Sequence, residues 1–519
     1  MRSRCVHERK RTGCVTCKTR HVRCGEEKPI CHNCKRLKKE CSYAPTDDAA
    51  RPRRRTKTDI TFKAVTFPLA PTTHPQAPIK KATSSRERRV FDFFCQRTVP
   101  LLSHNFSSEF WTYDVLQMFE SVPAIRHCIL ALASLHLDAH DGKHEIGATE
   151  ASSCCLTSSS TSHYFGALSC LRRAIDPAFI ERSSLEVALV ASTLLAIYES
   201  LLGCGKQSRI HVHHGIQLAL QSQSDGANSR VFFPTVRLLG TFKLGQRMLS
   251  REGDTAAEKS FDSMFMDLIA LRQADSEIEK LVFKSLSVNH KVVQFATDCD
   301  SGKFVGRTEE RHAMHSHLLN LVQDCRGDLA NADYPDAHAV KILRSQLELT
   351  WIILRRGMDG GQTSYDGCTQ NFETILHLVE SVLVGRDQVN QPPLAFSIDL
   401  GFIPLLLFVA RLCRQPILRR KAIDMLAMCP PTDGNWDRQR AIAAARAVIR
   451  FEEQCEDDDA PHPIPEERRV HHILFDDSNS ETSKSEENMR ITLMTRPKGD
   501  TMGFNSATFH IPVERLAIG

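Results

Sequence analysis

After residue 90, apolar residues recur every three or four positions over much of the chain, the spacing that gathers them on one face of a helix. The pattern is clear in residues 123–137, where its members are Ile125, Cys128, Ile129, Leu132 and Leu135. Residues 183–203 repeat it, with serines to cap the start and a glycine to end it. Further helices are expected near residues 318–329, 339–354, 372–384, 402–414 and 438–454. The sequence therefore predicts a mostly α protein with a large all-α body over residues 86–460.

The segments that flank this body lack helical periodicity. Residues 46–85 contain Pro52, Pro68, Pro71, Pro75 and Pro78 with many threonines and no apolar heptads, which predicts a flexible linker without a coiled coil. In the carboxyl-terminal extension, residues 461–519, two β-prone stretches at 471–476 and 489–497 enclose a polar spacer and predict a small β-hairpin. The serine- and cysteine-rich residues 152–162 are expected to form a loop.

No segment predicts a membrane span or a secretory signal. The most apolar stretches, residues 187–198 and 401–410, end at Glu199 and Arg411, short of the roughly 18 residues that a span requires. The basic amino terminus is not followed by an apolar stretch of the kind found in signal peptides. The chain is therefore not expected to be secreted or inserted in a membrane.

Charge is distributed unevenly along the chain. Residues 1–90 carry 24 Lys and Arg against 8 Asp and Glu, whereas the remainder carries 43 against 54. The amino-terminal part therefore has a net charge of +16 and the rest −11. A basic head on an acidic body indicates that the head meets a polyanion, with nucleic acid the leading candidate and an anionic membrane surface the second.

Six of the 19 cysteines form an internal repeat within the basic head. The unit C-x2-C-x6-C occurs first as Cys14, Cys17 and Cys24, and then as Cys31, Cys34 and Cys41. A C-x2-C pair lets two thiolates bind one metal ion from a tight turn, and the spacing suits tetrahedral zinc. Two tetrahedral ions need eight ligand positions, so with six thiolates two sulfur atoms must each bind both ions. Disulfides are the alternative, but a basic segment without a secretion signal favours metal.

Residues 13–45 resemble the fungal Zn2Cys6 binuclear-cluster DNA-binding domain, preceded here by a basic arm at residues 1–12. In that family the first and fourth cysteines bridge two Zn2+ ions. The resemblance thus implies that Cys14, Cys17, Cys24 and Cys31 hold one ion and that Cys14, Cys31, Cys34 and Cys41 hold the other. Cys5 matches no ligand position, and Pro29 lies in the loop that joins the two halves.

The same resemblance implies how the head reads DNA. In this family the third and fourth residues after the second cysteine contact a CGG triplet, and these are Arg20 and His21. An arginine can bind O6 and N7 of guanine, whereas His21 stands where some members have lysine. Contacts to the DNA backbone are expected from Lys18, Arg23, Lys35, Arg36, Lys38 and Lys39.

A second cluster of cations follows the cysteines. It consists of Arg51, Arg53, Arg54, Arg55 and Lys57. Such a cluster either contacts further phosphates or serves as a nuclear import signal, and with the DNA-binding head it predicts a nuclear location.

The body also resembles a known family domain. The aromatic residues between 91 and 111, the helix at residues 123–136 and the segment HYFGALSCLRRAI at residues 163–175 resemble the fungal-specific transcription factor domain. This resemblance covers residues 90–220 and implies a helical regulatory body without a catalytic motif. The expected partners are double-stranded DNA, the transcription machinery and a second copy of the chain, bound through the helical body.

Several other features are weaker indications of function. His211, His213 and His214, like His136, His140 and His144, lack a carboxylate or cysteine at familiar metal-ligand spacing. The segment LGCGKQS at residues 202–208 departs from the phosphate-binding loop pattern and predicts a helix end and a loop. The acidic run from Glu452 to Asp459 is either a solvated loop or an acidic activating segment.

The sequence thus predicts a transcription regulator of RNA polymerase II genes that recognises CGG-containing sites. Two other functions remain open: a chromatin or cofactor scaffold that binds DNA weakly and without specificity, and a regulator that senses a metabolite. No catalytic motif is present, so an enzyme is not expected.

Overall fold

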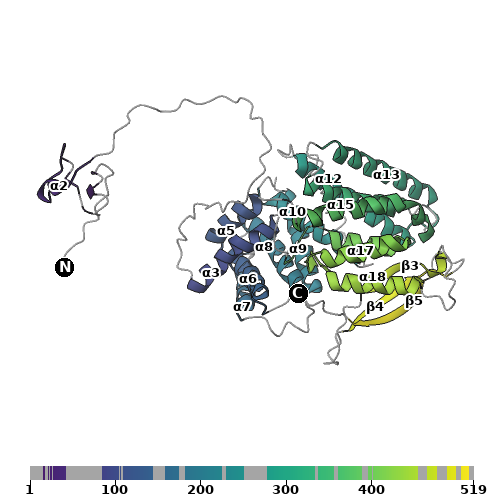
Figure 1. Cartoon of the computed structure of the whole chain (residues 1–519). Coiled ribbons are helices and arrows are strands. Elements are labelled where there is room, and N and C mark those ends of the chain that lie inside the picture. Colours follow the sequence, from purple (N-terminus) through teal and green to yellow (C-terminus); the bar gives the residue numbers. More distant parts are fainter. Residues whose placement is uncertain are drawn as a thin grey trace. The chain divides into compact units, whose positions relative to one another are not determined.

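The computed structural model describes the chain in segments that fall into two compact units, Met1–Gln76 and Ala77–Gly519. The described residues are 14, 16–17, 22, 24–25, 27–42, 84–103, 106, 109–143, 158–174, 182–224, 230–249, 277–332, 337–355, 361–387, 395–399, 401–453, 464–475, 488–497 and 504–512. Figure 1 shows the elements of both units. The linker predicted at residues 46–85 lies outside the described residues except for its last two.

The first half of the larger unit is built from helices. They are α3 (Ser85–Phe93), η1 (Phe94–Thr98), α4 (Val99–Leu102), η2 (Phe110–Asp114), α5 (Val115–Ser121), α6 (Pro123–His140), α7 (Ser158–Ala174), α8 (Arg182–Leu201), α9 (Gly205–Ser224) and α10 (Phe232–Leu249). The predicted helices at 123–137 and 183–203 are confirmed as α6 and α8. The predicted loop at 152–162 is wrong from Ser158 onward, where α7 begins.

The second half continues the helical pattern. Its helices are α12 (Glu277–Asp300), α13 (Thr308–Ala330), α14 (His338–Arg355), η5 (Gln362–Cys368), α15 (Thr369–Asp387), α16 (Phe402–Leu412), α17 (Pro416–Met428), α18 (Arg438–Glu453) and η6 (Glu466–Arg468). The five helices predicted here are confirmed as α13, α14, α15, α16 and α18. None of the helices that the structure describes combines the length and the apolar character needed to cross a membrane.

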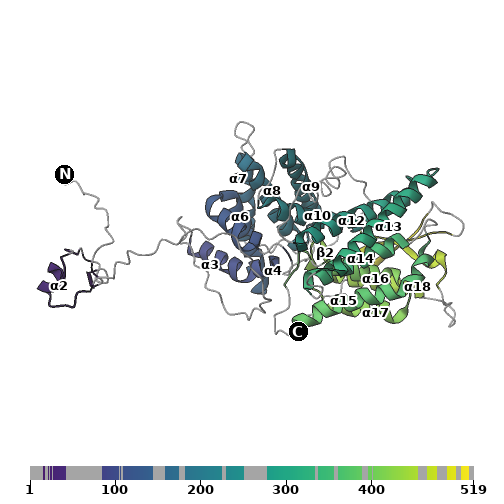
Figure 2. The ribbon, with the colours of Figure 1, turned by 90° about the horizontal axis from the view of Figure 1, so that it is seen from above.

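The buried apolar residues of the larger unit form three main clusters. The first core lies among α3 to α10 and includes Phe396 and Ile398, and the second core lies among α14 to α18. The third core joins α12, α13 and α14. Helix α14 contributes to two of these cores. Ile342 and Leu349 on one face enter the second core, whereas Val340 and Leu347 on another face enter the third. Figure 2 shows α14 beside α13 and α16.

A short two-stranded hairpin in the second half of the larger unit contacts helices of the first half. Strands β1 (Thr432–Asp433) and β2 (Trp436–Asp437) pair in antiparallel fashion around Gly434, whose φ of 58° favours glycine. The hydroxyl of Ser200 in α8 donates to the Gly434 carbonyl, and the Ser208 hydroxyl in α9 contacts the Asn435 side-chain oxygen at 2.9 Å. The turn of the hairpin therefore fixes the second core's helices to the first half of the body.

The carboxyl-terminal sheet has three antiparallel strands, β3 (Val470–Phe475), β4 (Asn488–Thr495) and β5 (Asn505–Pro512), in the order β3-β4-β5. The predicted hairpin is confirmed as β3 and β4, which pair from Val470 with Thr495 to Phe475 with Ile491. Strand β5 was not predicted. Val470, Ile491 and Leu493 pack against Val448 of α18, so the sheet covers this helix (Figure 1).

A buried ionic network lies between α18, α17 and the start of β3. The Glu452 carboxylate, 1% exposed, accepts hydrogen bonds from Arg414 Nη2 at 2.9 Å and Arg419 Nη2 at 2.8 Å. The backbone N–H of Val470 also donates to Glu452 at 2.7 Å. The prediction that residue 452 begins a solvated or activating acidic segment is therefore wrong, because Glu452 is a buried counter-ion; residues 454–460 lie outside the described part.

Replacing Glu452 with glutamine should destabilise the body strongly. The substitution removes the carboxylate that Arg414 and Arg419 share, and it leaves the fully buried Arg419 only its longer ion pair with Glu453 at 3.3 Å. Breaking a buried ion pair in this way costs about 3–5 kcal/mol. The matched control is Glu380→Gln, which breaks a half-exposed ion pair with Lys421 and should cost under about 1 kcal/mol. Urea unfolding of both variants measures the difference, and equal midpoints would contradict the proposed role of the network.

Candidate metal centre

The six repeated cysteines come together in the smaller unit. The side-chain sulfur atoms form two groups, Cys14, Cys17, Cys24 and Cys31, and then Cys14, Cys31, Cys34 and Cys41. Within each group all sulfur atoms lie within 4.8 Å of one another. These are the same two sets that the resemblance implied, and Cys14 and Cys31 belong to both.

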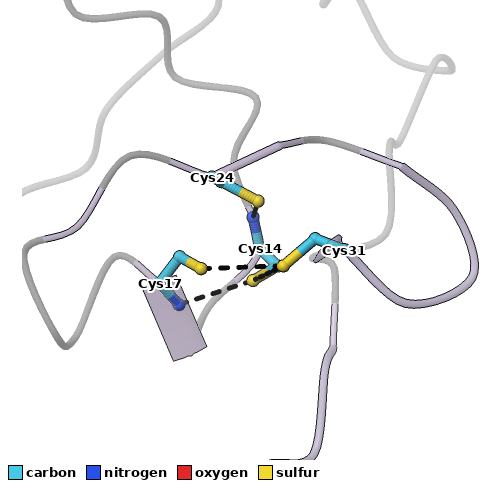
Figure 3. Close-up of side chains that lie close together, drawn as sticks. All are labelled: Cys14, Cys17, Cys24 and Cys31. Atoms are coloured by element: carbon cyan, nitrogen blue, oxygen red, sulfur yellow. Dashed lines mark hydrogen bonds between the residues drawn. The ribbon is translucent and has the colours of Figure 1, made fainter. Parts of the chain in front are cut away.

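The spacing of the sulfur atoms fits tetrahedral zinc. Zn–S bonds of about 2.3 Å at tetrahedral angles separate neighbouring sulfurs by about 3.8 Å. Cys14 and Cys31 Sγ are 3.8 Å apart, and Cys17 and Cys31 Sγ are 3.6 Å apart (Figure 3). In the second group, Cys14 and Cys34 Sγ are 3.8 Å apart. A disulfide would bring two sulfurs to about 2.05 Å, and the cysteines that the structure describes form none. The donor atoms therefore suit a thiolate-bound metal.

The two halves of the centre repeat the same backbone contacts. The N–H of each first cysteine lies 3.3 Å from the sulfur ten residues later, from Cys14 to Cys24 and from Cys31 to Cys41. The N–H of each second cysteine donates to the sulfur of the first, from Cys17 at 3.4 Å and from Cys34 at 3.5 Å. The sequence repeat is thus a structural repeat, and these N–H groups offset part of the negative charge on thiolate sulfurs.

A short helix begins the second half. Helix α2 (His32–Arg36) starts at Cys31, whose sulfur caps it by accepting from the Cys34 N–H. The described residues of the first half show a helical turn at the matching position, residues 16–17. The Thr16 hydroxyl donates to the Glu40 carbonyl at 2.7 Å and connects the two halves. Cys14, Cys17, Cys31 and Cys34 are buried, whereas Cys24 and Cys41 are partly exposed.

The sulfur environment shows why a cation is needed. Burial raises the pKa of Cys14 well above its usual range and that of Cys34 to about 12. The backbone N–H of Cys34 instead lowers the pKa of Cys31 to about 6. Hydrogen bonds alone would therefore keep few of the crowded sulfurs ionised, and a bound divalent cation supplies the positive charge that favours the thiolates.

The surface of the second half is cationic. Lys35, Arg36, Lys38 and Lys39 are all exposed on α2 and the turn that follows it. The other residues predicted to contact DNA lie outside the described part of the chain, and so does Cys5. They are Lys18, Arg20, His21, Arg23, Arg51, Arg53, Arg54, Arg55 and Lys57. The structure thus shows one of the predicted cationic surfaces and leaves the contacts of the first half as predictions.

The repeat also reveals an asymmetry that the sequence interpretation missed. Counting from the second cysteine of each half, Leu37 takes the place that Arg20 has in the first half. The Leu37 side chain is exposed, and a leucine cannot donate hydrogen bonds to a base. Comparing the two copies of the repeat position by position would have shown this difference.

Among the described residues, the histidines noted in the sequence as weak metal candidates do not come together as metal ligands. His136 is buried and contacts the Thr98 hydroxyl through Nδ1 at 2.9 Å. His211 contacts the Tyr164 hydroxyl at 3.4 Å, and His213 contacts the Gln217 amide. His144 lies outside the described part.

Comparisons with known proteins match both units. The model of the fungal Zn(2)-Cys(6) binuclear cluster domain matches residues 12–50, and that of the fungal specific transcription factor domain matches residues 89–281. These domains are those of transcription factors and not of enzymes. No solved structure matches the chain.

Curated relatives match over shorter stretches. The Zn(2)-C6 fungal-type transcription factor afumD of Aspergillus fumigatus is 32% identical over 136 residues, 26% of this chain and 34% of that protein. The transcriptional activator protein UGA3 of Saccharomyces cerevisiae is 35% identical over 78 residues, 15% of this chain and 14% of that protein. The sterol uptake control protein 2 of Candida albicans is 51% identical over 37 residues, 7% and 5% of the two chains.

The matches thus span about a third or less of the length of these relatives. The cysteine centre and the cluster-domain match together indicate zinc binding at the amino-terminal unit. Residues 12–50 and 89–281 are thus similar, in this order, to the two domains of fungal transcription factors that carry a Zn(2)-Cys(6) binuclear cluster.

Proposed function

We propose that this chain is a sequence-specific DNA-binding transcription regulator that recognises CGG-containing sites through its cysteine centre. The observation that carries the proposal is the pair of cysteine groups sharing Cys14 and Cys31, within the segment that matches the fungal cluster domain. The centre holds two Zn2+ ions, each bound by four sulfurs. The helical body regulates this activity, and the chain acts in the nucleus.

The sharing of sulfur atoms supports two ions. Two groups of four sulfurs exist among six cysteines, and each group matches the size of one tetrahedral zinc site. Six thiolates and two Zn2+ ions leave the centre with a net charge of about −2. Binding to DNA therefore depends on the cations around the centre, and residues 1–60 carry 18 Lys and Arg against 7 Asp and Glu.

The two halves have different tasks in this proposal. Arg20 of the first half reads guanine, because its guanidinium can donate two hydrogen bonds to O6 and N7. The second half, with exposed Leu37 at the equivalent place, contacts the backbone phosphates through Lys35, Arg36, Lys38 and Lys39. One unit then reads one triplet, and a longer site requires a second unit, as in a homodimer formed through the body. The body also provides the surface for the transcription machinery.

Exchange of Cys14 for serine should remove nearly all bound zinc, because its sulfur belongs to both groups. Cys17→Ser should retain part of the zinc, since the second group keeps all four of its sulfurs. The control is Cys5→Ser, which should bind as much zinc as the unaltered chain. Elemental analysis of the purified chains gives the zinc content, and equal loss in the Cys14 and Cys17 variants would contradict a shared sulfur.

The zinc-loaded chain should prefer a CGG-containing duplex over a scrambled one at least tenfold at about 0.15 M salt, equivalent to about 1.4 kcal/mol. Arg20→Ala should abolish this preference, because a good bidentate contact is worth about 1–3 kcal/mol. The matched control is Lys18→Ala, which should weaken binding to both duplexes alike.

Fluorescence anisotropy with the two labelled duplexes measures these affinities. A chain that binds both duplexes equally would contradict base reading and favour a scaffold with non-specific DNA affinity. A preference that survives Arg20→Ala would assign base reading to another residue.

A further inference from the structure

A cavity lies in the body where the first and second cores meet. Its walls come from α10, α12, α14, the start of α16 and the β1–β2 hairpin. The cavity has a volume of about 70 Å3, and the empty space that includes its open mouth is about 670 Å3. Most of the wall is apolar, and its largest side chains are Phe242, Leu244, Met248, Ile353, Leu405 and Trp436. Ligand sites in proteins are commonly concave and apolar with a few polar groups of this kind.

Trp436 contributes an unsatisfied hydrogen-bond donor to this wall. Its side chain is buried, and its indole N–H has no acceptor among the described residues. Gly245 of α10 lies beside the indole, since a Cβ at that position would be 3.2 Å from Nε1. Because buried donors are rarely left without an acceptor, the indole N–H indicates that an oxygen atom of an occupant belongs there.

Two amide side chains in the wall can adapt to an occupant. Asn289 Oδ1 is 2.6 Å from the Thr350 hydroxyl, and Asn435 Oδ1 is 2.9 Å from the Ser208 hydroxyl. Each hydroxyl also has a backbone carbonyl within reach, at Gln346 or Ala196, and carries only one proton. Either end of each amide can therefore satisfy the hydroxyl, which leaves the other end to donate to, or accept from, the occupant.

The charge of the wall selects a neutral occupant. Asp433 is the charged residue among the lining residues, and no Lys or Arg is among them. Its carboxylate is already engaged, because the backbone N–H of Phe402 at the start of α16 donates to it at 2.8 Å. An anionic ligand would lose its hydration without meeting a counter-ion, and a cation would meet a carboxylate already committed to the helix.

We propose that this cavity binds a small, neutral, mostly apolar molecule that presents a hydroxyl or carbonyl oxygen to the indole N–H of Trp436. This inference goes beyond DNA binding and does not depend on the cysteine centre. The occupant contacts α10 on one side and α14 and α16 on the other, so it bridges the two halves of the body. Its binding site is independent of DNA and is tested without it.

The probe for this site is Prodan, a neutral fluorophore with an apolar ring system and one carbonyl oxygen. Prodan is larger than the cavity, so its carbonyl end should enter the cavity while its ring system fills the open mouth. Its emission moves to shorter wavelength in apolar surroundings and back when the carbonyl accepts a hydrogen bond. Titration into the full zinc-loaded chain should give saturable binding with blue-shifted emission. The chain has three tryptophans, Trp111, Trp351 and Trp436, so excitation of tryptophan should also give sensitised Prodan emission.

Two variants separate this site from adventitious binding. Val293→Phe places a larger side chain in the cavity from a half-buried position of α12 and should abolish saturable binding. Trp436→Phe keeps an apolar ring but removes the hydrogen-bond donor. It should weaken binding about two- to tenfold, shift the emission of bound Prodan further to the blue and lower the sensitised emission to the part contributed by the other tryptophans. The control Val305→Phe, at an exposed position, should bind like the unaltered chain.

Circular dichroism shows whether each variant is folded. If the Val293→Phe chain does not fold, the Trp436→Phe chain decides the outcome. The proposal is overturned if the unaltered chain shows no saturable binding, which would mean that water alone occupies the cavity. It is also overturned if a folded Val293→Phe chain, or the Trp436→Phe chain, binds with unchanged affinity and unchanged emission.

Discussion

Charge that is removed from water has to meet opposite charge, and both units of this chain are arranged around that requirement. In the smaller unit, sulfur atoms about 4 Å apart can be ionised together only beside cations, because repulsion and burial both favour the protonated thiols. In the larger unit, the Glu452 carboxylate lies between the guanidinium groups of Arg414 and Arg419. These contacts hold the surrounding elements in position, since moving either member of an ion pair away would leave a buried charge uncompensated.

The position of Glu452 explains how the carboxyl-terminal sheet is held. Its carboxylate accepts a hydrogen bond from the backbone N–H of Val470, the first residue of β3. Of its arginine partners, Arg414 lies between α16 and α17 and Arg419 lies in α17. Arg469, the residue before β3, is itself buried and pairs with Asp366 of η5 at 2.7 Å. Strand β3 is therefore anchored by ionic contacts on both sides of its start, and the apolar contacts of Val470, Ile491 and Leu493 with α18 complete the attachment.

The parts that could be predicted depend on short sequence separations. The cysteine groups follow from spacings of two and six residues, and α6, α8 and α14 follow from an apolar period of three to four. The failures depend on long separations. Glu452 reads as the first residue of an acidic run, and its partners Arg414 and Arg419 are 38 and 33 residues away. Strand β5 alternates small, polar and apolar residues too weakly to predict a strand before its partner β4 is known. The cavity could not be predicted because its wall combines residues from 241 to 436.

The β1–β2 hairpin connects these observations, because it carries Trp436 in the cavity wall and holds the two halves of the body together. Its turn meets α8 and α9 through hydrogen bonds of Ser200 and Ser208, and its Asp433 caps the start of α16. Contacts made by an occupant with Trp436 therefore act on an element that already fixes helices of both cores. A molecule that binds only the folded body raises its free energy of unfolding. The increase grows with the logarithm of the ratio of ligand concentration to dissociation constant. Such a molecule changes the stability of the body without any contact with DNA, which gives the body a physical means of responding to a signal while the cysteine centre remains unchanged.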